Sequence, residues 1–201
     1  MKILVLGGTG MVGSDIAKEA ARRGHDVTIA SRSGSTVDDL PSATIDLQDT
    51  DALVSAATAY DALVLAVPSD RTGGDTAPTI EAHRRLIAAA PQTRLFVVGG
   101  AGALSVGDVL LKDTPEFPAA YKAESDTFAA VLDLYRAAEG LDWTMLAPSP
   151  MIAPGPAGEP VLGTDSPVGD SVTTGTFAVA ALDELEQPAH RGTRFTVADK
   201  A

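Results

Sequence analysis

Short apolar runs alternate along the chain with longer stretches in which apolar residues recur at helical spacing. The apolar runs predict strands over residues 3–6, 27–30, 43–45, 61–67, 94–98, 142–147 and 194–197. The stretches between them predict helices over residues 11–23, 49–59, 79–90, 119–139 and 174–186. Regular alternation of strand and helix is typical of an α/β fold with a doubly wound parallel sheet and right-handed crossovers.

The first predicted strand stops at a turn with three evenly spaced glycines, Gly7, Gly10 and Gly13. Gly7 permits a tight turn, Gly10 lets the backbone approach a diphosphate, and Gly13 lets the next helix pack against the sheet. The N-terminus of that helix offers unpaired N–H groups and a positive dipole end to an anion. This context favours a dinucleotide site over a structural turn. It also favours a Rossmann-like sheet of order 3-2-1-4-5-6-7 over a flavodoxin-like one, whose phosphate loop does not usually carry this spacing.

Ser31, Arg32 and Ser33 follow the second strand, where a dinucleotide fold meets the adenosine ribose. A site selective for NAD usually has an acidic side chain there, whereas the 2′-phosphate of NADP requires arginine and hydroxyl donors. The sequence therefore predicts that NADPH is preferred over NADH; the alternative is a solvated loop arginine. Asp46 and Leu47 follow the third strand, beside the expected adenine. Asp46 is either an acceptor for the adenine amino group or a simple turn aspartate.

Two segments leave the carboxyl ends of strands, where folds of this class bind ligands. Pro68 ends the fourth strand, and the polar residues 69–75 predict either a rim of the nicotinamide and substrate site or a mobile loop. Residues 148–172 are rich in proline and glycine, and a connection of this length is usually functional or disordered. Because this segment follows the sixth strand, we expect it to close over the nicotinamide half of the cofactor.

Composition narrows the classes of protein that remain. Residues 1–201 fit one domain, and the lack of cysteine excludes disulfides, thiol catalysis and zinc–thiolate sites. The net charge of −12 repels nucleic acid and anionic membranes. No stretch approaches the ~18 apolar residues of a membrane span, so we expect a cytoplasmic protein. His83 stands beside two arginines without a second ligand at metal spacing, so we expect it at the surface and expect no metal.

Five blocks of sequence, residues 7–13, 97–102, 117–122, 141–144 and 183–186, together suggest a family. The chain resembles the atypical short-chain dehydrogenases with NAD(P)-binding folds, specifically the NmrA-like and flavin reductase or biliverdin reductase B-like group. The resemblance spans nearly the whole chain. Two departures concern the substrate pocket, which therefore need not match that of the relatives. Residues 163–169 look shortened, and Thr176 stands where relatives often have an acidic residue.

The resemblance implies a role for each segment around the cofactor. The glycine turn would line the diphosphate, Arg32 would meet the 2′-phosphate, the end of the fourth strand would pass the inner ribose, and the turn after the sixth strand would meet the nicotinamide carboxamide. The complete set of predicted cofactor-binding residues is Gly7, Thr9, Gly10, Met11, Val12, Gly13, Ser31, Arg32, Ser33, Asp46, Leu47, Ala66, Val67, Pro68, Gly99, Gly100, Pro148, Ser149 and Pro150.

The larger superfamily uses a Tyr-x-x-x-Lys pair and a serine after the fifth strand, and this chain departs from both patterns. Residues four apart share a helix face, yet Tyr121 has Ser125 at that position, and Lys122 points elsewhere. Tyr121 is therefore more consistent with a helix start, and the turn after the fifth strand supplies no serine. Tyr121 and Ser149 remain the candidate catalytic residues.

Two functions fit these observations. The first is NADPH-dependent reduction of a planar small-molecule acceptor, such as a flavin or quinone, by direct hydride transfer. Such a transfer depends mainly on proximity and orientation, and solvent can supply the proton. The second is that of an NmrA-like regulator that binds the dinucleotide without turning it over. A sugar epimerase or alcohol dehydrogenase would need the missing proton relay. Either a monomer or a homodimer is compatible with the sequence.

Overall fold

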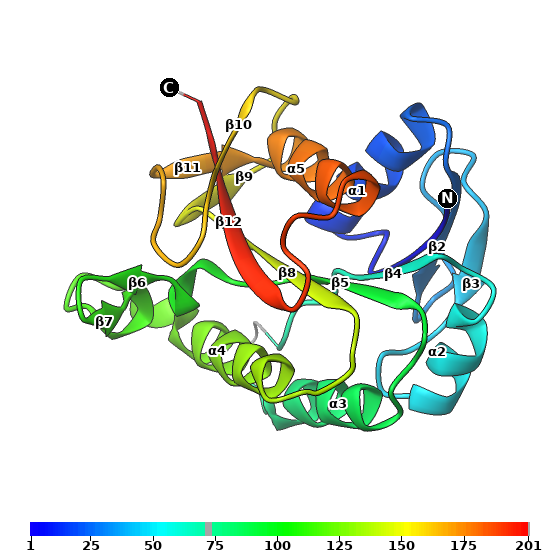
Figure 1. The fold of residues 1–201 in the computed structure, drawn as a ribbon, viewed down its shortest axis with the longest axis horizontal. Coiled ribbons are helices and arrows are strands. Elements are labelled where there is room, and N and C mark those ends of the chain that lie inside the picture. The colour runs from blue at the N-terminus through cyan, green and yellow to red at the C-terminus, as the bar shows by residue number, and fades with distance from the viewer. Residues whose placement is uncertain (71–73, 201) are drawn as a thin grey trace.

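The computed structural model describes residues 1–70 and 74–200 and contains a main sheet of eight strands (Figure 1). Across this sheet the strand order is β10-β12-β8-β5-β4-β1-β2-β3. Its strands are β1 (Lys2–Leu6), β2 (Asp26–Ser31), β3 (Ser42–Thr44), β4 (Ala62–Leu65), β5 (Arg94–Val98), β8 (Trp143–Pro148), β10 (Pro160–Gly163) and β12 (Thr193–Asp199). Two small sheets pair β6 (Ser105–Val106) with β7 (Val109–Leu110) and β9 (Met151–Ala153) with β11 (Ser171–Thr173).

The seven strands predicted from apolar runs are all parallel and lie in the predicted order, so the doubly wound Rossmann-like fold is confirmed. The eighth strand, β10, was not predicted. It pairs antiparallel with β12, with Pro160 opposite Asp199 and Gly163 opposite Thr196. The segment 148–172 is thus not structureless, because β9, β10 and the start of β11 lie within it.

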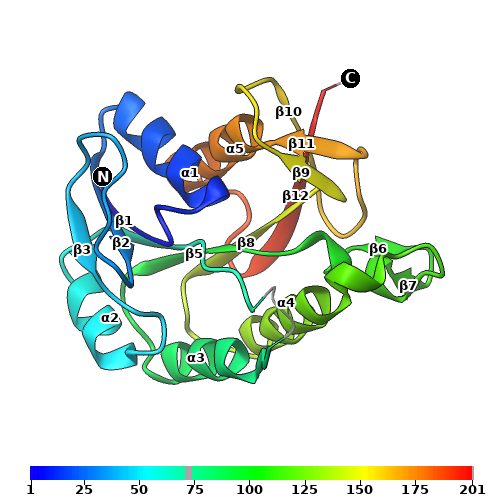
Figure 2. The same ribbon diagram turned by 180° about the vertical axis from the view of Figure 1, so that it is seen from behind.

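Helices cover both faces of the main sheet, as Figures 1 and 2 show. One face carries α1 (Met11–Arg22) and α5 (Thr174–Glu186); the other carries α2 (Thr50–Ala57), α3 (Ala77–Ala88) and α4 (Lys122–Arg136). Short 3-10 helices lie at η1 (Ala101–Ala103), η2 (Leu111–Asp113) and η3 (Ala119–Tyr121). The helix predicted over residues 119–139 is therefore wrong at both ends, since its α-helical part begins at Lys122 and ends at Arg136.

The two-residue period of the strands divides the core into two layers. Ile3 and Val5 of β1 join the cluster beneath α1 and α5, whereas Leu4 and Leu6 join the cluster beneath α2, α3 and α4. All four side chains are at most 1% exposed. Successive side chains of a strand point to opposite faces, so a central strand covered on both sides must be apolar throughout.

His83 is buried rather than at the surface, which corrects the expectation from the sequence. Its residue is 1% exposed, and its Nδ1 lies 3.1 Å from the hydroxyl of Tyr135, which is itself fully buried on α4. His83 belongs to the inward face of α3 with Ala82 and Leu86, although its charged neighbour Arg84 is exposed. Burial lowers the pKa of His83 to about 4, so this histidine is neutral at pH 7.

This burial predicts a loss of stability in mild acid. The unfolded chain takes up the His83 proton near pH 6.5 and the folded chain only near pH 4, so about 3 kcal/mol of unfolding free energy should disappear between those values. Urea unfolding at a series of pH values measures this loss. The variant His83→Gln should lose correspondingly less over the same interval, and identical pH profiles for the two proteins would contradict the assignment.

Candidate functional site at the carboxyl edge of the sheet

The glycine turn is packed too closely for side chains at two of its three predicted positions. Gly7 has a φ of +83°, and a Cβ there would lie 2.4 Å from the carbonyl oxygen of Ala66. A Cβ on Gly13 would lie 2.3 Å from the Gly7 oxygen and 3.2 Å from the Ala66 side chain. At Gly10 the closest atom would be 3.2 Å away, again the Gly7 oxygen. Gly7 and Gly13 are therefore required by the packing of β1, α1 and β4, whereas Gly10 is not.

The N-terminus of α1 is not capped by any side chain. Gly10 is the N-cap residue, in an extended conformation, and the first turn contains no acidic residue. Ser14 donates its backbone N–H to the Gly10 oxygen at 2.9 Å, and the N–H groups before it lack partners within the helix. Thr9, Gly10 and Met11 are exposed. The arrangement suits an anion approaching along the helix axis.

Arg32 lies directly after β2, and its side chain is exposed. Within the described residues it has no ion-pair or hydrogen-bond partner. The hydroxyls of its sequence neighbours Ser31, Ser33 and Ser35 form a row, since the Ser33 oxygen lies 3.4 Å from that of Ser31 and 2.7 Å from that of Ser35. Ser35 was not singled out in the sequence; its alternation with Ser31 and Ser33 was the available signal. A free guanidinium among hydroxyl donors is chemically suited to a phosphate group.

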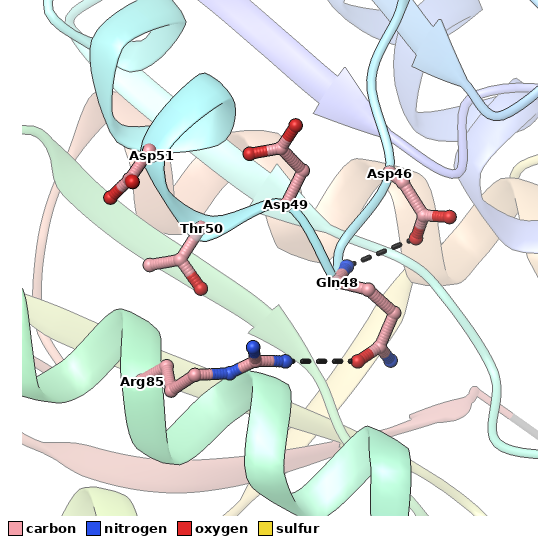
Figure 3. Close-up of a pocket in the computed structure, with 6 residues that line it drawn as sticks. All are labelled: Asp46, Gln48, Asp49, Thr50, Asp51 and Arg85. Carbon is pink, nitrogen blue, oxygen red and sulfur yellow. Dashed lines mark hydrogen bonds between the residues drawn. The ribbon is translucent and has the colours of Figure 1, made fainter.

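The residues after β3 line a polar cavity of about 460 Å³ between α2 and α3 (Figure 3). Asp46 accepts a hydrogen bond from the Gln48 backbone N–H at 3.0 Å, and Arg85 donates to the Gln48 side chain at 3.1 Å. The cavity lining is Asp46, Gln48, Asp49, Thr50, Asp51 and Arg85. Asp46 thus makes the contact of a turn aspartate. With three carboxyl groups against one guanidinium, the cavity suits an uncharged hydrogen-bonding group better than a phosphate.

Beyond the carboxyl ends of β4 and β5 lie the segments predicted to follow the cofactor toward its nicotinamide end. The Gly99 N–H donates to the Leu146 oxygen at 2.8 Å, which keeps the turn after β5 beside β8. Past Pro68, the side chain of Ser69 is only 6% exposed and its hydroxyl has no hydrogen-bond partner. Ser69 belongs to the polar segment 69–75 predicted as a rim of the site, but nothing in the sequence distinguished it from the other residues of that segment. Residues 71–73 of the predicted rim lie outside the described residues.

Ser149 holds the backbone instead of presenting a free hydroxyl. It is fully buried directly after Pro148, the last residue of β8, and both its N–H and its hydroxyl donate to the Val197 oxygen, at 3.0 and 2.8 Å. This double contact ties to β12 the start of residues 148–172, which we call the substrate-side segment after its predicted position. Pro150, the next residue, is exposed.

Tyr121 ends η3 and is 61% exposed. Lys122 is occupied by Asp126 at 2.7 Å and Asp113 at 3.2 Å, and Ser125, one helical turn beyond Tyr121, is buried against Gly102. The structure therefore brings no lysine of the described chain to the position of the superfamily's tyrosine–lysine pair.

The buried charged cluster around Glu184 lies at the start of β5, remote in the sheet from the glycine turn. Arg94 donates to the Glu184 carboxylate at 2.8 Å and to the Glu184 and Leu185 carbonyls that end α5. Burial alone would raise the pKa of Glu184, but hydrogen bonds from Ala189 and His190 hold it below its usual value. The cluster fixes the end of a helix. No group of His, Asp or Glu residues in the described chain has a metal-binding arrangement.

The parallel sheet and its glycine turn define a Rossmann-fold dinucleotide-binding protein. Residues 7–188 match the family model described as NAD(P)H-binding, and the chain belongs to this family, among the atypical short-chain dehydrogenase and NmrA-like proteins. YwnB of Bacillus subtilis is 35% identical over 214 residues and is matched over the full length of both chains. None of the described helices is long and apolar enough to cross a membrane.

Two solved structures are also similar. A Burkholderia pseudomallei protein named "putative exported protein" is 31% identical with a TM-score of 0.88, covering 98% of this chain and 99% of its own. A Streptococcus pneumoniae protein named "putative NADH-flavin reductase" is 28% identical with a TM-score of 0.81, and each chain is covered completely. These likenesses extend over the substrate-side segment as well as the glycine turn.

Because Gly13 is packed more closely than Gly10, substitutions at the two positions should affect different properties of the protein. Gly13→Ala should lower the unfolding free energy by about 1–3 kcal/mol, because its Cβ would overlap the Gly7 oxygen. Gly10→Val should fold normally but lose the dinucleotide, because the branched side chain would occupy the space of the diphosphate. Thermal unfolding and calorimetric titration with NADPH separate the two effects. Unchanged affinity in a folded Gly10→Val protein would place the diphosphate elsewhere.

Proposed function

We propose that the protein is an NADPH-dependent reductase of a planar acceptor, a flavin or a quinone-like molecule, acting by direct hydride transfer. The observation that carries the cofactor choice is Arg32, an exposed, unpaired arginine within a row of serines, where an NAD site would have an acid. The proposal includes binding of this cofactor by all the residues that the sequence predicts to contact it. The name of the Streptococcus pneumoniae relative supports a flavin acceptor.

Direct hydride transfer is compatible with the side chains available at the carboxyl edge. Tyr121 is largely exposed and lacks a lysine partner, and the hydroxyl of Ser149 is bound to a backbone carbonyl. A reaction that needs a positioned proton relay is therefore disfavoured. Transfer between two stacked rings requires mainly that they be held at about 3–3.5 Å in the correct orientation, with solvent supplying the proton. The cofactor supplies the hydride, and the protein binds and orients both rings.

The exposure of Tyr121 and its lack of a lysine partner also favour a second candidate, an NmrA-like protein that binds the dinucleotide without turnover. Both candidates require the glycine turn and Arg32, and they differ only in whether an acceptor is reduced. The cytoplasmic location and the choice between monomer and homodimer stay predictions from the sequence.

Arg32→Ala tests the cofactor preference. Loss of one charge-assisted hydrogen bond should weaken NADPH binding by about 1.5–3 kcal/mol, roughly 10- to 100-fold. NADH binding should change little, because NADH has no 2′-phosphate. The matched control is Arg84→Ala, which removes another exposed arginine, on α3. Fluorescence titrations of all three proteins with both cofactors give the comparison. Equal affinities of the wild type for NADPH and NADH would refute the preference.

Steady-state oxidation of NADPH with riboflavin or FMN as acceptor distinguishes reductase from sensor. The reductase should turn over, and Tyr121→Phe should keep its activity within about threefold because no tyrosine proton is needed. A loss beyond ~100-fold in this variant would identify Tyr121 as a general acid. Absence of turnover by the wild type with any flavin or quinone, despite NADPH binding, would favour the sensing function.

A further inference from the structure

Arg194 is a buried arginine near the start of β12, with only 2% of its surface exposed. Side chains alternate along this strand. Phe195 and Val197 enter the core beneath α1 and α5, so Arg194 faces the side of the sheet that carries α4. Burial lowers the pKa of Arg194, although the Asp165 carboxylate opposes this effect. A buried guanidinium is costly unless it is paired, so its partners show what it holds.

The partners of Arg194 belong to two segments that are far apart in sequence. Its Nη1 donates to the carbonyl oxygen of Ala103, the last residue of η1, at 2.7 Å. Its Nη2 donates to the carboxylate of Asp165 and, at 3.4 Å, to the carbonyl oxygen of the same residue. That carbonyl also accepts the Ser105 backbone N–H at 2.7 Å. One guanidinium therefore joins η1 to the loop that follows β10.

These two segments differ in how firmly they are held. A Cβ on Gly102 would lie 2.4 Å from the Ser125 side chain, so η1 sits directly against α4 and cannot move toward it. The loop after β10 has no helix of its own, and the carboxylate of Asp165 is 62% exposed. The buried contacts that hold this loop are those with Arg194 and Ser105, whereas the half-exposed Arg136 adds only a surface ion pair of small energetic value.

Both segments extend from the proposed nicotinamide end of the site. η1 begins directly after Gly99 and Gly100, which are predicted to contact the cofactor, and Asp165 lies in the segment expected to close over it. We propose that Arg194 is a positioning residue for the acceptor: by joining Ala103 to Asp165, it fixes the relative position of two segments that would flank the planar acceptor over the nicotinamide. This inference rests on the proposed reductase function and adds a determinant of acceptor affinity that does not touch the cofactor.

The test compares wild type with Arg194→Lys and Asp165→Asn. A lysine ammonium lacks the planar fork that reaches two acceptors at once, so Arg194→Lys should raise the KM for riboflavin about tenfold. Asp165→Asn keeps an oxygen acceptor but loses the charge, and should shift the KM in the same direction by a smaller factor. The Kd for NADPH should stay within about twofold of the wild-type value in both variants, because neither residue is among those predicted to contact the cofactor. The matched control is Arg136→Gln, which removes only the half-exposed arginine at 3.3 Å from Asp165.

If Arg194 had a purely structural role, Arg194→Lys would lower the thermal unfolding temperature and kcat. It would not raise the riboflavin KM while leaving the NADPH Kd unchanged. An unchanged riboflavin KM in folded Arg194→Lys, or equal weakening of riboflavin and NADPH, would overturn the inference while wild-type turnover still supported the reductase. If the wild type shows no turnover, riboflavin binding to its NADP⁺ complex replaces KM in the same comparison. If the wild-type complex binds no flavin or quinone either, both the reductase proposal and the role of Arg194 are wrong.

Discussion

The structure depends on the contact of β1, α1 and β4 at two glycines. The Gly7 oxygen lies where a Cβ on Gly13 would be, and the Ala66 oxygen lies where a Cβ on Gly7 would be. Backbone therefore packs directly on backbone, which brings the helix start to the carboxyl edge of the central strands. The same close approach places uncapped N–H groups beside the ends of β2 and β4. The proposed dinucleotide site is thus a direct consequence of how the first helix meets the sheet.

The other end of α1 is fixed by charge. Arg23 donates to Glu19 on its own helix and to Asp183 and Glu186 on α5, all at 2.7–2.8 Å, and His25 adds a contact to Glu186 at 2.8 Å. Burial alone would lower the pKa of Arg23, but these carboxylates raise it above its usual value. Glycine contacts at one end and ion pairs at the other give α1 a defined orientation, so its N-terminus is directed consistently at the site.

Features set by neighbours in sequence could be predicted, whereas features set by distant partners could not. The glycine turn and the seven parallel strands depend on local runs of residues, and the rule of right-handed crossovers converts those runs into a strand order. The strand β10 has only a two-residue apolar run, Val161 and Leu162, and its pairing with β12 depends on a segment more than 30 residues away. His83 stands among charged residues, and only the packing of α3 on α4 decides that it faces inward. Arg194 and Asp165 are 29 residues apart, and no spacing rule connects them.

The edges of the main sheet bear on how the protein behaves at high concentration. Unpaired edge strands offer free N–H and C=O groups to other chains, which promotes aggregation. Here one edge is β3, of three residues, and the other is β10, of four residues beginning with Pro160, which has no N–H to donate. Residues 148–172 thus have a structural role besides their proposed contact with the cofactor. By placing a short, proline-bearing strand along β12, they shield a seven-residue parallel strand from pairing with another molecule.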